Sequence, residues 1–174
     1  MEQIEQVSNK STSNRNLRKG LGIIIGLAPA IFTAHFLEES PGFVAWFNAH
    51  VQSGITTRLF WNVNISALAI TLIIMSIELV EPSFFSACLV ILWLSFLMLA
   101  NALFHITGAI VDRHYMPGLI TAVIFYLPYY VFVLVRLLQK DRIRSGSAIA
   151  FAILGSALML IHGYLIIFRG SRLF

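Results

Sequence analysis

The residues of this chain with the clearest potential for chemistry are an imidazole and two carboxylates at the end of an apolar stretch, His35, Glu38 and Glu39. At about 100° of rotation per helical residue, Glu38 lies about 60° to one side of His35 and Glu39 about 40° to the other. One helical turn therefore presents all three groups together, provided that the helix continues through Glu39. Such a set could ligate Zn, Fe or Mn, or could transfer protons without a metal.

Other polar residues belong to the same interpretation. His105 follows Asn101 by four residues, so the two share a helix face, and His162 lies seven residues after Gly155, on a face of small residues that is typical of helix packing. Two overlapping sets of candidates result. The catalytic candidates are His35, Glu38, Glu39, His105, Asn101 and Tyr115, and the candidate metal ligands are His35, Glu38, Glu39, His105 and His162.

The composition indicates a membrane environment for these residues. Hydrophobic residues make up 58% of the chain and charged residues 11%, against about 25% charged residues in soluble proteins. A water-soluble monomer is thereby excluded, as is disorder over most of the chain. The single cysteine, Cys88, excludes an intramolecular disulfide and any metal site built from several cysteines. The basic residues lie at the ends of apolar runs, which favours membrane lipids and not nucleic acid as partners.

Five apolar runs have about the 20 residues that a helix needs to cross the hydrocarbon of a bilayer. They cover residues 20–37, 59–79, 83–111, 119–138 and 147–168. The sequence therefore predicts an all-α protein, an integral membrane bundle of five transmembrane helices. Residues 1–19 are expected to form a disordered basic cytoplasmic tail, and residues 20–174 the transmembrane domain.

The distribution of Lys and Arg predicts the orientation. With the N-terminus in the cytoplasm and the C-terminus outside, eight basic residues lie inside and four outside, and every histidine falls on the outer side. A cleaved signal peptide is the alternative, because Ala28-Pro29-Ala30 resembles a cleavage site. The continuation of the apolar run to Leu37 weighs against cleavage. We expect a multi-pass protein of the cytoplasmic membrane.

Two features of the predicted helices give further expectations. The small residues Gly22, Gly26, Ala30 and Ala34 recur every four positions and predict a packing stripe that turns the first helix, with its ionisable end, into the bundle. In the fourth helix, Pro128 lacks a backbone donor and predicts a kink. Such a kink could open a cavity beside Tyr126, Tyr129 or Tyr130.

Three elements in order resemble a known family. The motif His35-Phe36-Leu37-Glu38-Glu39, the later His105, and the segment Tyr115-Met116-Pro117-Gly118 are similar to the small integral membrane proteins named for their HXXEE motif, in which a second histidine and a YXPG motif accompany the first. The motifs cover residues 35–118, and the pattern of apolar runs extends the resemblance over most of the chain. It implies an integral membrane protein and brings no established reaction.

Three functions stay open. The first is an enzyme acting on a lipid or isoprenoid that enters from the bilayer, with His35 and His105 as ligands or acid–base groups, Glu38 and Glu39 as ligand and general base, and Asn101 and Tyr115 as orienting hydrogen-bond partners. The second is a small proton- or cation-coupled transporter, which the few polar groups in the inner halves of the helices disfavour. The third is a non-catalytic membrane scaffold. The metal and the oligomeric state stay open as well.

Overall fold

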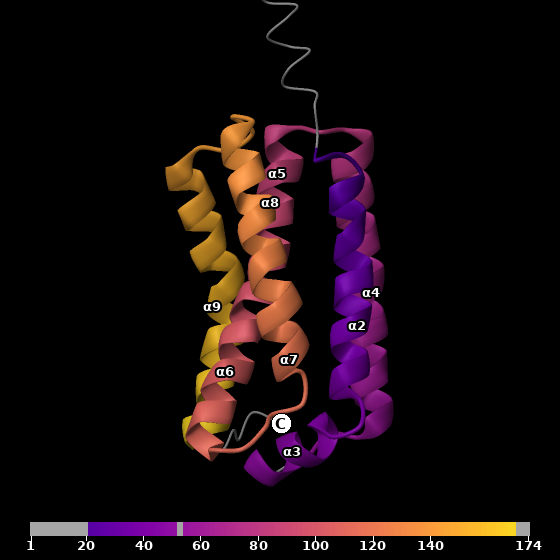
Figure 1. Cartoon of the computed structure of the whole chain (residues 1–174), viewed down its shortest axis with the longest axis vertical. Helices are drawn as coiled ribbons and strands as arrows, with labels where there is room; N and C mark the ends of the chain where they lie inside the picture. Colours follow the sequence, from indigo (N-terminus) through magenta and orange to yellow (C-terminus); the bar gives the residue numbers. More distant parts are fainter. Residues whose placement is uncertain (1–20, 52–53, 170–174) are drawn as a thin grey trace, which may run out of the picture.

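The computed structural model describes residues 21–51 and 54–169, and over these residues the chain is all-helical. Five of its helical stretches are long and apolar enough to cross a membrane (Figure 1). They comprise Gly22–Glu39, Thr57–Val80, Phe84–Asp112, Leu119–Gln139 and Ser145–Arg169. The predicted number of apolar helices and their places in the chain are thus confirmed. The orientation of the termini and the tail 1–19 stay predictions, the tail lying outside the described residues.

Several of these stretches are compound. The first joins a 3₁₀ turn to an α-helix, and the third and fourth each contain a π-helical segment. The elements in order are η1 (Gly22–Gly26), α2 (Leu27–Glu39), α3 (Phe43–His50), α4 (Thr57–Val80), α5 (Phe84–Leu94), π-helical η2 (Ser95–Ala100), α6 (Asn101–Asp112), α7 (Leu119–Thr121), π-helical η3 (Ala122–Tyr126), α8 (Leu127–Gln139) and α9 (Ser145–Arg169).

The third stretch, α5 to α6, forms the centre of the bundle. In its most apolar 18 residues 61% of the residues are buried, compared with 17% in the corresponding part of α4. Helix α9 crosses it closely, because a Cβ on Gly155 would lie 2.1 Å from the carbonyl oxygen of Leu92. Ala148 and Gly155 are both buried, so the predicted packing face of small residues on α9 is confirmed.

The first helix presents a different face from the predicted one. Gly22, Gly26 and Ala30 are exposed, so the prediction that this stripe packs into the bundle is wrong. The buried face instead carries Phe32 and Phe36, because aromatic rings supply more apolar contact area than small residues do. His35 and Glu39 belong to this buried face, so the ionisable end of the helix still turns inward.

In the fourth stretch, Pro128 lies in the first turn of α8, two residues after the π-helical turn η3, where a missing backbone donor is tolerated. Tyr129 donates a hydrogen bond to the carbonyl oxygen of Ile24 at 3.1 Å, and Tyr130 bonds Ser95 at 2.8 Å. The two tyrosines therefore tie this helix to η1 and η2 through the core.

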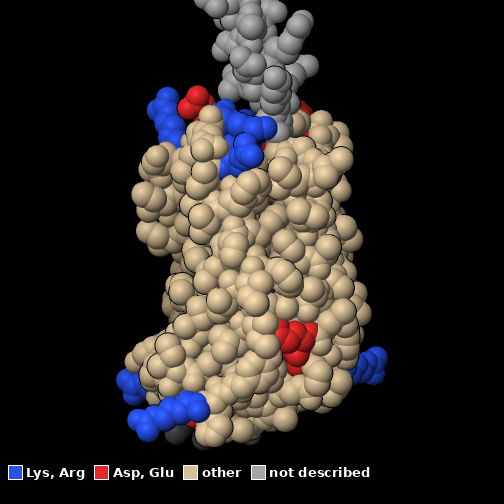
Figure 2. Space-filling view, in the orientation of Figure 1, with Lys and Arg blue, Asp and Glu red and all other residues tan. Residues whose placement is uncertain are grey.

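Charged side chains gather at the two ends of the molecule and leave an apolar band between them (Figure 2). At the end that carries the α4–α5 and α8–α9 connections, Arg142 donates hydrogen bonds to both carboxylate oxygens of Glu78 at 3.1 Å. It also donates to the carbonyl oxygen of Ser83 at 2.7 Å. Glu78 and Arg142 are both buried, so this ion pair joins the end of α4 to the α8–α9 connection.

Helix α3 covers the opposite end of the bundle (Figure 1). The indole N–H of Trp46 donates to Oδ2 of Asp112 at 2.6 Å, and Nε2 of His50 lies 3.1 Å from Oδ1 of the same carboxylate. Asp112 thus fastens α3 to the end of α6, over the place where α2 and α6 bring their histidines.

A candidate metal centre

His35 and Glu39 stand one turn apart at the end of α2, where Nε2 of His35 lies 3.4 Å from Oε1 of Glu39. The helix runs through Glu39, and its last turn is closed by the amide of Ser40, which donates to the carbonyl oxygen of Phe36. The condition set by the sequence, that the helix continue through Glu39, is therefore met. Both side chains face the interior.

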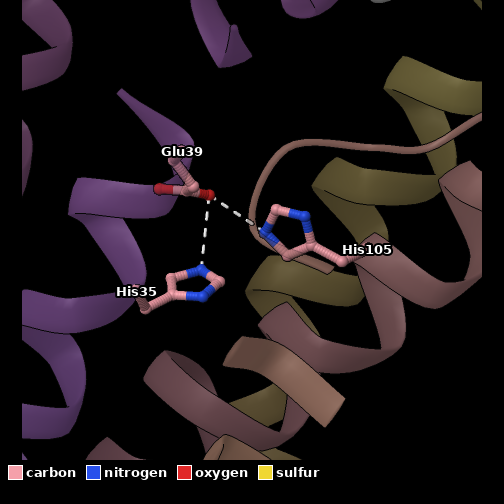
Figure 3. Close-up of side chains that lie close together, drawn as sticks. All are labelled: His35, Glu39 and His105. Atoms are coloured by element: carbon pink, nitrogen blue, oxygen red, sulfur yellow. Dashed lines mark ion pairs between the residues drawn. The ribbon is translucent and has the colours of Figure 1, made fainter. Parts of the chain in front are cut away.

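His105 approaches the same carboxylate from α6. Its Nε2 lies 2.9 Å from Oε1 of Glu39, and its ring stands edge-on to that of His35 at a centroid distance of 4.9 Å (Figure 3). The π-helical segment η2 precedes α6 and changes the face that α6 presents relative to α5. His35, Glu39 and His105 are all buried, at 0%, 4% and 0% exposure.

The buried nitrogens of this cluster are incompletely paired. The Nε2 atoms of His35 and His105 both form ion pairs with the single oxygen Oε1 of Glu39, at 3.4 Å and 2.9 Å, and Nδ1 of His105 has no hydrogen-bond partner among the described residues. Buried polar atoms without partners cost free energy, so a further group that binds these atoms would stabilise the cluster.

Thr121 determines which nitrogen of His35 faces the cluster. The Thr121 hydroxyl donates to the carbonyl oxygen of Gly118 at 3.3 Å and lies 2.8 Å from Nδ1 of His35. The contact between this hydroxyl and Nδ1 fixes the orientation of the ring and turns its other nitrogen, Nε2, towards Glu39.

The three donor atoms suit a metal ion. One ligand atom from each of His35, Glu39 and His105 lies within 4.8 Å of the other two. Ligands at about 2.0–2.2 Å from one tetrahedral metal lie about 3.3 Å apart, and the two N···O separations here are 3.4 Å and 2.9 Å. Two imidazoles and one carboxylate form a set that Zn²⁺ and Fe²⁺ both accept.

Gly118 closes the site from the loop before α7. Its φ of +95° is a conformation that favours glycine, and a Cβ there would lie 2.7 Å from Cε1 of His105, 2.8 Å from Cγ of Glu39 and 3.0 Å from Cε1 of His35. The last residue of the Tyr115-Met116-Pro117-Gly118 segment is therefore packed against all three members of the cluster. This contact gives the YXPG pattern a physical reason.

Glu38 lies beside the cluster and not within it. Its carboxylate accepts hydrogen bonds from the amides of Ile120 and Thr121, at 3.1 Å and 2.8 Å, and from the hydroxyl of Tyr115. It thus caps the start of the fourth stretch, where unpaired amides favour an anion. Partial burial and the bond to Glu38 raise the pKa of Tyr115 to about 12, so this hydroxyl stays a donor at neutral pH.

The remaining candidates line a neighbouring pocket. Asn101 and His162 lie on its wall together with Glu39 and several apolar side chains, so the structure brings both near the carboxylate. Neither joins the group of donor atoms that could hold a metal among the described residues. The structure thus brings together His35, Glu39 and His105, places Glu38 and Tyr115 on the adjoining helix start, and places Asn101 and His162 on the pocket wall.

Thr121 and Tyr126 are members of the site that sequence reasoning did not identify. The Tyr126 ring lies 4.2 Å from that of His35, and its hydroxyl is buried without a partner among the described residues. Thr121 is 86 residues from His35. Both contacts join segments far apart in the chain, so no local spacing in the sequence indicated them. The only signal was Pro128, because a wide helical turn is expected near a proline, and Tyr126 lies in such a turn.

Replacing Thr121 by valine is expected to weaken metal binding by about 10–100-fold, because a partner that orients a metal-binding histidine typically contributes that much. Valine keeps the shape of threonine but cannot accept from Nδ1 of His35. Affinity can be measured by competition with a coloured chelator. The matched control is Thr33→Val, which removes a hydroxyl that donates to Pro29 on the same helix; equal affinities in the two variants would contradict the assignment.

Comparison with known proteins agrees with the motifs. The model of a family described as "Protein of unknown function with HXXEE motif" matches residues 26–133, which include the whole candidate centre. No curated protein and no solved structure matches the chain significantly.

Proposed function

The chain belongs to the family of proteins of unknown function with an HXXEE motif, and we propose that it is an intramembrane enzyme whose divalent metal is held by His35, Glu39 and His105. The observation that carries the proposal is the convergence of their buried ligand atoms, in which two imidazole nitrogens meet one carboxylate oxygen. A purely structural polar cluster in a core would be expected to pair Nδ1 of His105 as well, and this atom has no hydrogen-bond partner among the described residues.

The five apolar helices cross the membrane in this proposal, with the N-terminus in the cytoplasm and the metal centre near the outer surface. Large apolar side chains support it, since Ile149, Ile153 and Leu158 of α9 are more than half exposed and suit contact with lipid. The apolar band between the two charged ends supports it as well (Figure 2). The excess of basic residues at the end with the α8–α9 connection favours the cytoplasm for that end.

Three protein ligands leave a coordination position open, which is typical of catalytic metal sites and not of structural ones. A divalent metal there would polarise a substrate oxygen or make a bound water more acidic. The adjoining pocket reaches Glu39 and is lined mainly by apolar side chains. We assign it to a lipid-like substrate that enters from the bilayer, because such a molecule need not leave the hydrocarbon to reach the centre.

Glu38 acts as a positioning residue in this proposal. By accepting from the amides of Ile120 and Thr121 it holds the start of the fourth helix against α2. That contact places Thr121 on His35 and Gly118 over the cluster. The two glutamates of the motif therefore have different tasks: Glu39 binds the metal, and Glu38 holds the loop that closes the site.

Metal analysis of the detergent-purified protein tests the proposal. We expect about one Zn or Fe per chain in the wild type and less than about 0.1 in His35→Ala and His105→Ala. The control is His114→Ala, because His114 is exposed at the same end and bonds the backbone of Asp112. The proposal of a metalloenzyme would be overturned if the wild type holds no stoichiometric metal, or if His35→Ala and His105→Ala both keep the metal. Either result would favour a scaffold or a proton-coupled protein.

A further inference from the structure

A pocket of about 270 Å³ adjoins the candidate centre and extends from Glu39 towards the surface of the bundle. Its walls come from α2, α3, α4, α6 and α9 and from the segment before α4. The aromatic rings of Phe43, Phe47 and Phe60 form much of its apolar surface. This volume is close to the lower limit of about 300 Å³ for ligand pockets, so it suits a small molecule or one chain of a lipid.

Four polar residues of the described chain line this pocket, Glu39, Asn64, Asn101 and His162, and one of their atoms is an unpaired acceptor. Oδ1 of Asn101 is buried and has no hydrogen-bond partner among the described residues. Nδ2 of Asn64 donates one of its two N–H groups to the carbonyl oxygen of Phe60 at 3.0 Å. Glu39 adds a carboxylate. A ligand that brings a hydrogen-bond donor would therefore pair the buried Oδ1 of Asn101.

The pocket opens at a surface suited to lipid. Leu59 and Val63, in the first turns of α4, line it and are 48% and 57% exposed. Both lie on an apolar helix long enough to cross a membrane, and near its end. At that depth the polar head of an amphiphile lies beside the helix end while its chain lies in the hydrocarbon. A molecule dissolved in the bilayer can thus reach the pocket sideways.

We propose that this pocket binds a long-chain alcohol from the bilayer, whose hydroxyl donates to Oδ1 of Asn101 while its chain lies against the phenylalanine rings. The proposal names the substrate class of the proposed enzyme and rests on that function for the reaction, but not for the binding. A carboxylate would face the negatively charged carboxylate of Glu39 and be repelled. A molecule without a donor would leave Asn101 buried and unpaired, at a loss of affinity.

Photolabelling in lipid nanodiscs tests the binding. The probe is a long-chain alcohol with a diazirine in its chain, and dodecanol and dodecyl methyl ether are the competitors. We expect dodecanol to displace the probe at about tenfold lower concentration than the ether, because only the alcohol donates to Asn101. Asn101→Leu should abolish this difference, and labelled peptides should include the α3 residues Phe43 and Phe47. Equal competition by the two molecules on the wild type would overturn the proposal.

The route of entry has its own pair of variants. Val63→Trp fills the opening and should reduce labelling at least about fivefold, whereas Ile153→Trp, a matched change at a lipid-facing site on α9 that is 66% exposed, should leave it unchanged. Equal labelling of the two would contradict lateral entry. Labelling needs no metal, so it can also be measured on His35→Ala. If this variant is still labelled selectively, the alcohol site stands even if metal analysis fails. If Asn101→Leu retains its metal, the metal centre stands even if labelling fails.

Discussion

Gly118→Ala is expected to lower the metal content of the purified protein at least about tenfold, although alanine adds a single methyl group. That methyl would lie within 3.0 Å of side-chain carbons of His35, Glu39 and His105. The residue also has a positive φ, in which a Cβ costs about 1–2 kcal/mol. Because all three clashes involve the proposed ligands, relaxation displaces either the ligands themselves or the loop that closes the site over them.

The matched control for this variant is Gly26→Ala. Gly26 lies in the same helical bundle at a negative φ, and a Cβ there meets no atom within 4 Å. It should keep the metal content of the wild type. Size-exclusion profiles of both variants check that the fold is retained. A Gly118→Ala protein that is monodisperse and retains full metal would show that the loop does not close the centre.

Arg142→Met is expected to destabilise the protein by about 3–5 kcal/mol, because it leaves the carboxylate of Glu78 buried without its counter-charge. Glu78 is fully buried, and its Oε2 also accepts a hydrogen bond from the hydroxyl of Ser86. The effect is measured as the change in the free energy of unfolding in detergent with increasing SDS. Metal content per folded chain should not change, since this pair lies at the opposite end of the bundle.

The double variant Glu78→Met with Arg142→Met provides the control. Replacing both members of a buried ion pair by apolar residues is often neutral or stabilising, whereas removing one is not. We therefore expect the double variant to recover most of the stability that Arg142→Met loses. If the double variant is as unstable as the sum of the single ones, Glu78 and Arg142 act independently and the ion pair does not hold this end together.

The helices could be predicted from sequence because their signal is local. A run of about 20 apolar residues suffices for a membrane-crossing helix, and such runs also end where charges and prolines begin. The pairing of His35 with Glu39 is local too, since residues four apart share a face of any α-helix. The turning of this face into the bundle was predicted correctly, but a stripe of small residues was given as the reason. Gly22 and Gly26 of that stripe are exposed, so the reason was wrong.

The division of labour between Glu38 and Glu39 could not be predicted in the same way. Both flank His35 on one turn, and only the position of the fourth helix decides which of them meets amides and which meets His105. The same holds for Thr121, Tyr126 and the partner of Glu78, whose contacts join segments far apart in the chain. Helical periodicity gives the face of one helix but not the rotation of its neighbours.

The measurement that tests the metal centre most directly is anomalous X-ray diffraction from crystals of the purified protein, recorded on either side of the absorption edge of its bound metal. We expect a single strong anomalous peak about 2.0–2.2 Å from Nε2 of His35, Nε2 of His105 and a carboxylate oxygen of Glu39. No peak at this position, or a peak held by other side chains, would contradict it.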